Sequence, residues 1–111
     1  MMWRKKGNRR LYVLIDESLD PIYGCVQGGH AVAQYMLEHR FFSRGSWKNE
    51  YLIYLSCDVS KWKDILEKKH KKFSAFYEPD LGNKLTAISI DKRKPSYLYG
   101  RLECKGNVEK S

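Results

Sequence analysis

The chain has 111 residues, of which 42% are hydrophobic and 14% are aromatic. A chain of this length forms one domain with a hydrophobic core, and this apolar content excludes an intrinsically disordered protein. The formal net charge is +8. Such an excess of lysine and arginine makes nucleic acid the leading partner, with a merely solvated basic surface as the alternative.

No stretch approaches the roughly 18 apolar residues of a membrane span, and the start of the chain lacks the apolar core of a secretory signal. We therefore expect a cytoplasmic protein. The three cysteines, Cys25, Cys57 and Cys104, are an odd number, lie far apart and form no Cys-x-x-Cys pair. This pattern predicts neither a disulfide framework nor a metal site.

Residues 1–10 form a basic arm that carries five cations and no acid. Such blocks suit phosphate backbones, so we expect the arm to bind RNA. Lys84, further along the chain, is a further candidate cation. The arm residues assigned to RNA binding are Arg4, Lys5, Lys6, Arg9 and Arg10.

The first regular element is the continuous apolar run Leu11–Ile15, which is typical of a strand buried on both faces. From Gly24 to Leu37 the periodicity is helical, and it predicts an inward stripe. That stripe contains Val26, His30, Ala33 and Leu37.

Gly28 and Gly29 lie inside this predicted helix, where each glycine costs about 0.5–1 kcal/mol relative to alanine. Either the helix packs closely on the sheet, or its first turns admit a ligand. The spacing fits neither a dinucleotide fingerprint nor a phosphate-binding P-loop, so no cofactor is expected.

The remaining pattern predicts strands over 50–57, 73–77 and 84–90, and a short element of uncertain type over 97–102. It also predicts a helix over 61–72 capped by Asp58 or Ser60. The inward stripe of that helix contains Trp62, Ile65, Leu66 and Lys69. This β-α-β-α-β-β order predicts a single compact α/β domain with a mixed four-stranded sheet. Its first two strands are parallel and its last two form a hairpin. We expect the domain to span residues 11–104 and a polar tail to span residues 105–111.

In open α/β sheets the functional crevice lies beyond the carboxyl ends of the parallel strands. That rule points to the segments after the first two strands and to the hairpin turn. The polar groups that could converge there, beside Gln27 and His30, are Asp16, Glu17, Glu78, Asp80 and Thr86. Turn carboxylates also commonly cap local backbone amides.

The segment Gln27-Gly-Gly-His30-Ala31, together with an aspartate turn before Leu85-Thr-Ala-Ile-Ser-Ile90, resembles the type 2 peptidyl-tRNA hydrolases. Their helix carries a Gln-Cys-Ser/Ala-His-Ala segment. The resemblance spans about Leu11 to Cys104. It implies a metal-independent α/β enzyme that hydrolyses the ester joining a peptide to the terminal ribose of tRNA.

By position, the resemblance assigns catalytic roles to Gln27, His30, Asp80 and Thr86. The family's functional lysine, which precedes the helix, has no counterpart here, and Tyr23 stands near its place. The turn between Asp80 and Thr86 is also shorter than the family's.

The chemistry requires a base to activate water and donors for the oxyanion. Asp80 or Glu78 could activate the water, and His30 could do so if it faces the crevice rather than the core. Lys84 or the arm could supply the missing positive charge.

Two alternatives remain open. The same fold could serve as a catalytically inactive adaptor for RNA or a protein, as the missing lysine suggests. A cysteine-dependent enzyme is a weaker alternative, because Cys25 and His30, five residues apart on one helix, point to different faces, and Cys25 more simply reads as a small packed residue.

Overall fold

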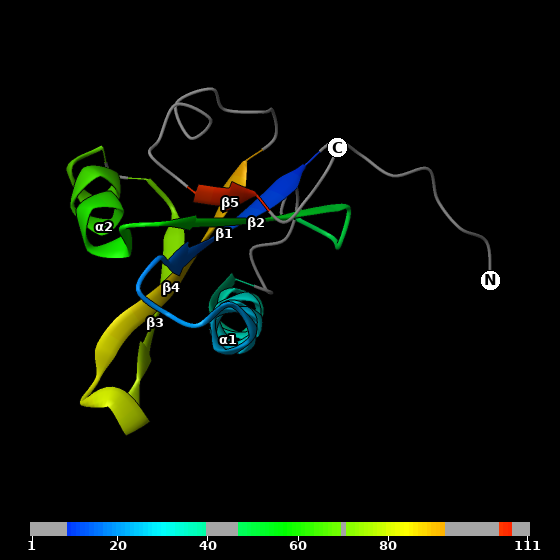
Figure 1. The fold of residues 1–111 in the computed structure, drawn as a ribbon. Helices are drawn as coiled ribbons and strands as arrows, with labels where there is room; N and C mark the ends of the chain where they lie inside the picture. The colour runs from blue at the N-terminus through cyan, green and yellow to red at the C-terminus, as the bar shows by residue number, and fades with distance from the viewer. Residues whose placement is uncertain (1–8, 40–46, 70, 93–104, 108–111) are drawn as a thin grey trace.

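The computed structural model describes residues 9–39, 47–69, 71–92 and 105–107 (Figure 1). Its elements are β1 (Arg10–Asp16), α1 (Pro21–His39), β2 (Tyr51–Cys57), α2 (Val59–Lys68), β3 (Phe73–Glu78), the short 3-10 helix η1 (Pro79–Leu81), β4 (Lys84–Lys92) and β5 (Lys105–Asn107). The element predicted over 97–102 lies outside the described residues.

The strands form one mixed sheet in the order β3-β4-β1-β2-β5. β1 and β2 are parallel, and β3 and β4 form an antiparallel hairpin, so both predicted pairings are confirmed. The sheet has one strand more than predicted, because β5 pairs with β2 at the start of the predicted polar tail. Its sequence, Lys-Gly-Asn, has no apolar alternation, and a strand that joins through its backbone leaves no such signal.

The two helices cover opposite faces of the sheet, as Figure 1 shows. Because successive strand side chains alternate between faces, β1 contributes to both cores. Leu11 and Val13 belong to the core under α1, whereas Tyr12 and Leu14 belong to the core under α2. The prediction of a strand buried on both faces is therefore confirmed.

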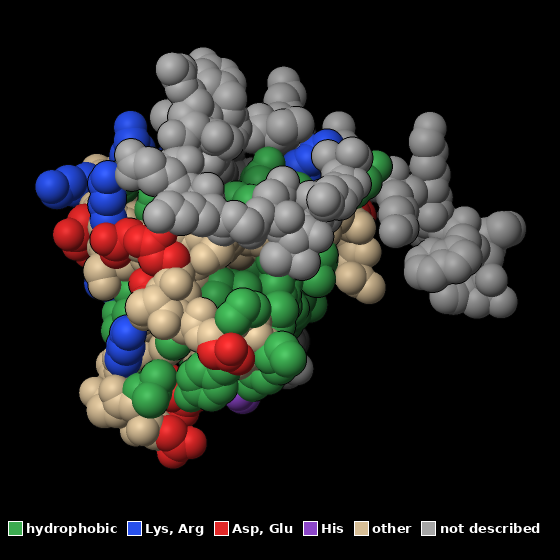
Figure 2. Space-filling model, in the orientation of Figure 1, with side chains coloured by type: hydrophobic (Ala, Val, Ile, Leu, Met, Phe, Trp, Pro, Cys, Tyr) green, Lys and Arg blue, Asp and Glu red, His purple; other side chains and the backbone are tan. Residues whose placement is uncertain are grey.

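The inward stripe predicted for α1 is wrong. His30 and Ala33 are exposed, and so is Leu37, whose side chain is 68% accessible. Figure 2 shows hydrophobic side chains gathered on the surface where α1 lies. The helix is apolar on two sides, so periodicity alone could not tell which side packs on the sheet. The side that does so contains Gly24, Gln27, Gly28, Ala31 and Tyr35.

Close packing explains Gly24 and Gly28 but not Gly29. A Cβ atom at Gly24 would lie 2.8 Å from Cγ2 of Ile15, and one at Gly28 would lie 2.8 Å from Cε2 of Tyr54. At Gly29 a Cβ would meet nothing within 4 Å. Two glycines one turn apart thus allow α1 to approach β1 and β2.

α2 begins and ends earlier than predicted. Asp58 is its N-cap, as predicted, and its carboxylate accepts a hydrogen bond from the backbone N–H of Lys61 at 3.2 Å. Trp62 and Leu66 face the core as predicted. Lys69, predicted to face inward, is an exposed C-cap residue, because the chain leaves the helix there before β3 begins.

Gly28→Ala and Gly29→Ala form a matched test of this packing. Gly28→Ala is expected to destabilise the fold by about 1–3 kcal/mol, because the new methyl group overpacks against Tyr54. Gly29→Ala is expected to stabilise it by about 0.5–1 kcal/mol through helix propensity. Urea unfolding of both variants measures the difference, and equal effects would contradict the assigned packing face.

Candidate functional site

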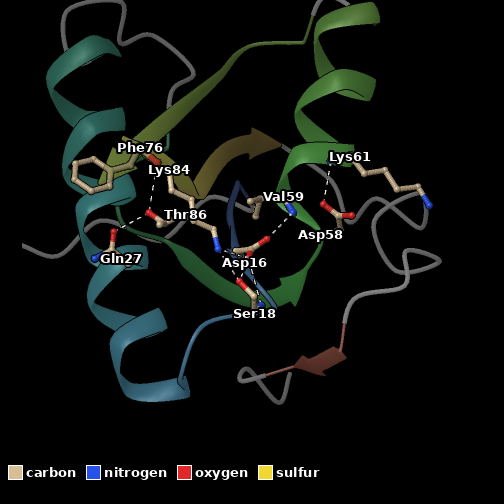
Figure 3. Close-up of polar contacts among 9 residues, drawn as sticks. All are labelled: Asp16, Ser18, Gln27, Asp58, Val59, Lys61, Phe76, Lys84 and Thr86. Carbon is tan, nitrogen blue, oxygen red and sulfur yellow. Dashed lines mark hydrogen bonds and ion pairs between the residues drawn. The ribbon is translucent and has the colours of Figure 1, made fainter. Parts of the chain in front are cut away.

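The candidate site lies where the first turns of α1 meet the β3–β4 hairpin. Three side chains that are distant in sequence form a continuous chain of hydrogen bonds there. The hydroxyl of Thr86 donates to Oε1 of Gln27 at 2.7 Å. Nε2 of Gln27 donates to Oε1 of Glu78 at 2.8 Å. The first of these contacts is drawn in Figure 3.

These three side chains are withdrawn from solvent to different degrees. Thr86 is 0% exposed, Gln27 is 1% exposed and Glu78 is 8% exposed. A buried amide must satisfy both its oxygen and its nitrogen, and the hydroxyl and the carboxylate do this. Gln27 and Thr86 therefore hold Glu78 in position, and neither is accessible to a substrate in this structure.

A β-bulge explains why Thr86 points toward α1. Leu85 pairs with Tyr77 and Ala87 pairs with Phe76, so Thr86 is the extra residue on β4. A bulge breaks the alternation of side chains and redirects one of them. Leu85 packs in the core under α2 and Ala87 in the core under α1, while Thr86 reaches Gln27.

Glu78 is the last residue of β3 and caps η1. Its Oε2 accepts a hydrogen bond from the backbone N–H of Asp80 at 3.0 Å. This bond is the largest of the effects that lower the pKa of the Glu78 carboxyl, and the hydrogen bond from the amide of Gln27 comes next. Burial raises this pKa, but less than those two bonds lower it, and the nearby His30 lowers it slightly more. Glu78 is thus an ionised carboxylate with both oxygens held by donors.

His30 is exposed and lies beside Glu78, not in the core. Its ring stacks on that of Phe76, with centroids 4.6 Å apart and an interplanar angle of 12°. The imidazole is therefore oriented by β3 and accessible to solvent. His30 therefore does not lie in the core, and its ring is available to act as a base.

Asp80 is exposed on η1, and its backbone, not its carboxylate, joins the hydrogen-bond chain. Sequence reasoning placed Asp80 before Glu78, because the resemblance aligned an aspartate turn. The geometry gives Glu78 the more central position. The sequence indicates the role of Glu78 only through its position at the end of the strand over 73–77.

The ammonium group of Lys84 contacts Asp16 and Ser18 and not Glu78. Lys84 pairs with Glu78 in the hairpin register, yet its Nζ lies 3.7 Å from Oδ2 of Asp16 and donates to the hydroxyl of Ser18 at 3.0 Å (Figure 3). Oδ1 of Asp16 in turn accepts from the backbone N–H of Val59 at 3.4 Å. Lys84 and Asp16 thus link the hairpin to the carboxyl end of β1, with the Lys84 side chain exposed and that of Asp16 largely buried.

Two of the arm's cations also make contacts within the fold. Nε of Arg9 lies 3.1 Å from Oδ1 of Asp91, a buried carboxylate that also accepts hydrogen bonds from the hydroxyl of Tyr35 and the backbone N–H of Trp47. The guanidinium of Arg10 lies over the ring of Tyr51, 4.9 Å from its centroid. Arg4, Lys5 and Lys6 lie outside the described residues.

Cys25 is exposed, which corrects its interpretation as a packed residue. It lies on the side of α1 near Tyr54 of β2, whereas His30 stacks on β3. The prediction that Cys25 and His30 face different directions is confirmed. Cys57 is buried, and Cys104 lies outside the described residues.

Within the described ranges, no group of three or more His, Cys, Asp or Glu side chains could hold a metal ion. Neither α1 nor α2 has the length and apolarity needed to cross a membrane.

The sequence matches no family model and no curated protein. Its fold is similar to the solved structure of a protein of unknown function from Agrobacterium tumefaciens strain C58, with a TM-score of 0.56 and 9% sequence identity. The match covers 80% of this chain and 90% of the other. Both chains therefore share a compact α/β fold.

The lowered pKa of Glu78 gives a pH prediction. A carboxyl whose pKa is lower in the folded state stabilises the fold above its ordinary pKa, and this contribution is lost as the pH falls through the folded value. The wild type should therefore exceed Glu78→Gln in stability at neutral pH, and the difference should shrink below pH 4.5. Urea unfolding across this range measures it; a difference that grows in acid would contradict the assigned direction.

Proposed function

We propose that the chain is a peptidyl-tRNA hydrolase-like protein that binds tRNA or another RNA in the cytoplasm and hydrolyses the peptidyl-tRNA ester. The observation that carries the proposal is the hydrogen-bond chain from Thr86 through Gln27 to Glu78, with His30 exposed beside it. Gln27, His30 and Thr86 are three of the four residues that the resemblance assigns to catalysis. The mixed sheet between two helices supports the same assignment of the fold.

In this proposal His30 is the general base. Its imidazole removes a proton from water as the water oxygen attacks the ester carbonyl carbon, and it returns that proton to the ribose oxygen when the ester bond breaks. The ionised Glu78 stabilises the positive charge that forms on His30 in between. Stacking on Phe76 keeps the ring in place.

Turnover of a purified N-acetyl-aminoacyl-tRNA tests the catalytic assignment. His30→Ala is expected to lower kcat by about 10²- to 10⁴-fold, the usual range for losing a general base. Glu78→Gln should also lower kcat. Asp80→Ala should lower kcat less than Glu78→Gln if Glu78, and not Asp80, is the carboxylate that supports His30. Asp64→Asn, an exposed carboxylate on α2, is the matched control. Unchanged turnover in both His30→Ala and Glu78→Gln would reject the site.

RNA binding is expected to depend on salt and on the arm. If the protein contacts several phosphates, raising the salt from about 50 to 200 mM should weaken its affinity for RNA more than about tenfold. Replacing Arg4, Lys5 and Lys6 by Gln should weaken binding and flatten this dependence. The matched control replaces Lys68, Lys69 and Lys71, which are exposed at or just after the end of α2, and it removes the same number of charges. Equal losses in both triple variants would show a net-charge effect without an arm site.

The second candidate is a catalytically inactive adaptor of the same fold. It is favoured by the contact of Lys84 with Asp16 and Ser18, which directs this ammonium away from Glu78. The adaptor predicts no turnover by pure wild-type protein at any concentration, together with a specific partner retained in a pull-down.

A further inference from the structure

Tyr23 lies on the same side of α1 as the proposed catalytic groups. It precedes Gln27 by four residues and His30 by seven, spacings that align side chains along one face of a helix. Its side chain is half-buried, and its backbone N–H donates to the carboxylate of Asp20 at 3.4 Å in the first turn. Tyr23 therefore lies in the first turn of α1, one turn before Gln27 on this side of the helix.

The hydroxyl of Tyr23 is protonated and close to the carboxylates of the hairpin. Burial raises its pKa most, and the negative charges of Glu78 and Asp80 raise it further. A phenol in this state offers a proton for hydrogen bonding and does not give it up at neutral pH. Among the residues that the structure describes, its hydroxyl has no hydrogen-bond partner.

Ester hydrolysis at this site needs such a donor. When water attacks the ester carbonyl, negative charge develops on the carbonyl oxygen next to an ionised Glu78, and a preorganised donor is required to stabilise it. Gln27 is buried and already donates to Glu78, and Lys84 contacts Asp16 and Ser18. Tyr23 is half-buried and its hydroxyl is free to donate.

We propose that the Tyr23 hydroxyl is a catalytic hydrogen-bond donor that stabilises the oxyanion formed during ester hydrolysis, an inference that rests on the proposed function. The attacking water forms the new C–O bond, His30 holds the proton taken from it, and the ester C–O bond to the ribose then breaks as that proton passes to the leaving oxygen. Tyr23 keeps its own proton throughout.

Tyr23→Phe tests this role, because it removes only the hydroxyl. Turnover of N-acetyl-aminoacyl-tRNA should fall on the order of 10²-fold in kcat, the effect of losing one oxyanion donor. Affinity for deacylated tRNA and the urea midpoint should stay unchanged. Tyr54→Phe, the same change at a half-buried tyrosine near the opposite side of α1, is the matched control and should retain full turnover.

The outcomes separate this inference from the proposed function. Full turnover by Tyr23→Phe alongside its loss in His30→Ala would overturn the role of Tyr23 and leave the hydrolase in place. Equal losses in Tyr23→Phe and Tyr54→Phe would also overturn that role, because the effect would not be specific to the site. No turnover by the pure wild type would overturn both.

Discussion

The amide of Gln27 is the constraint on which the candidate site depends. It joins α1 to both strands of the hairpin, because it accepts from Thr86 of β4 and donates to Glu78 of β3. An amide buried at this interface must have both partners, since each unsatisfied polar group costs about 1–3 kcal/mol. Helix and hairpin are therefore fixed relative to one another, and the carboxylate of Glu78 is held beside His30. The site is a consequence of satisfying one buried side chain.

Much of the fold could be predicted from the sequence, because strong local patterns identify elements. The apolar run of β1, the cap at Asp58 and the β3–β4 hairpin were predicted, as was the parallel pairing of β1 with β2. The packing face of α1 could not be predicted, because the helix is apolar on two sides. Gly24 and Gly28 decide it, since only a side without Cβ atoms can approach Ile15 and Tyr54 so closely. β5 pairs through a polar backbone segment that carries no pattern.

The sequence predicted which residues lie together in the candidate site better than it predicted what each of them does. Gln27, His30 and Thr86 do converge, but a bulge that redirects Thr86 leaves no signal in a regular alternating strand. Glu78 is more central to the site than Asp80, because the side chain of Glu78 accepts the hydrogen bond from the buried amide of Gln27. Long-range contacts of this kind depend on register, which local patterns do not determine. The same holds for Arg9, whose partner Asp91 is distant in sequence.

A double-mutant cycle in urea between Gln27→Met and Thr86→Val tests the central claim most directly. Both changes roughly preserve volume and remove one partner of the same hydrogen bond. Each single change takes a hydrogen-bond partner from a buried polar group, so the double variant should be more stable than the sum of the single losses predicts, with a coupling of about 1 kcal/mol or more. Additivity within about 0.5 kcal/mol would contradict the account, because it would mean that Gln27 and Thr86 do not satisfy one another.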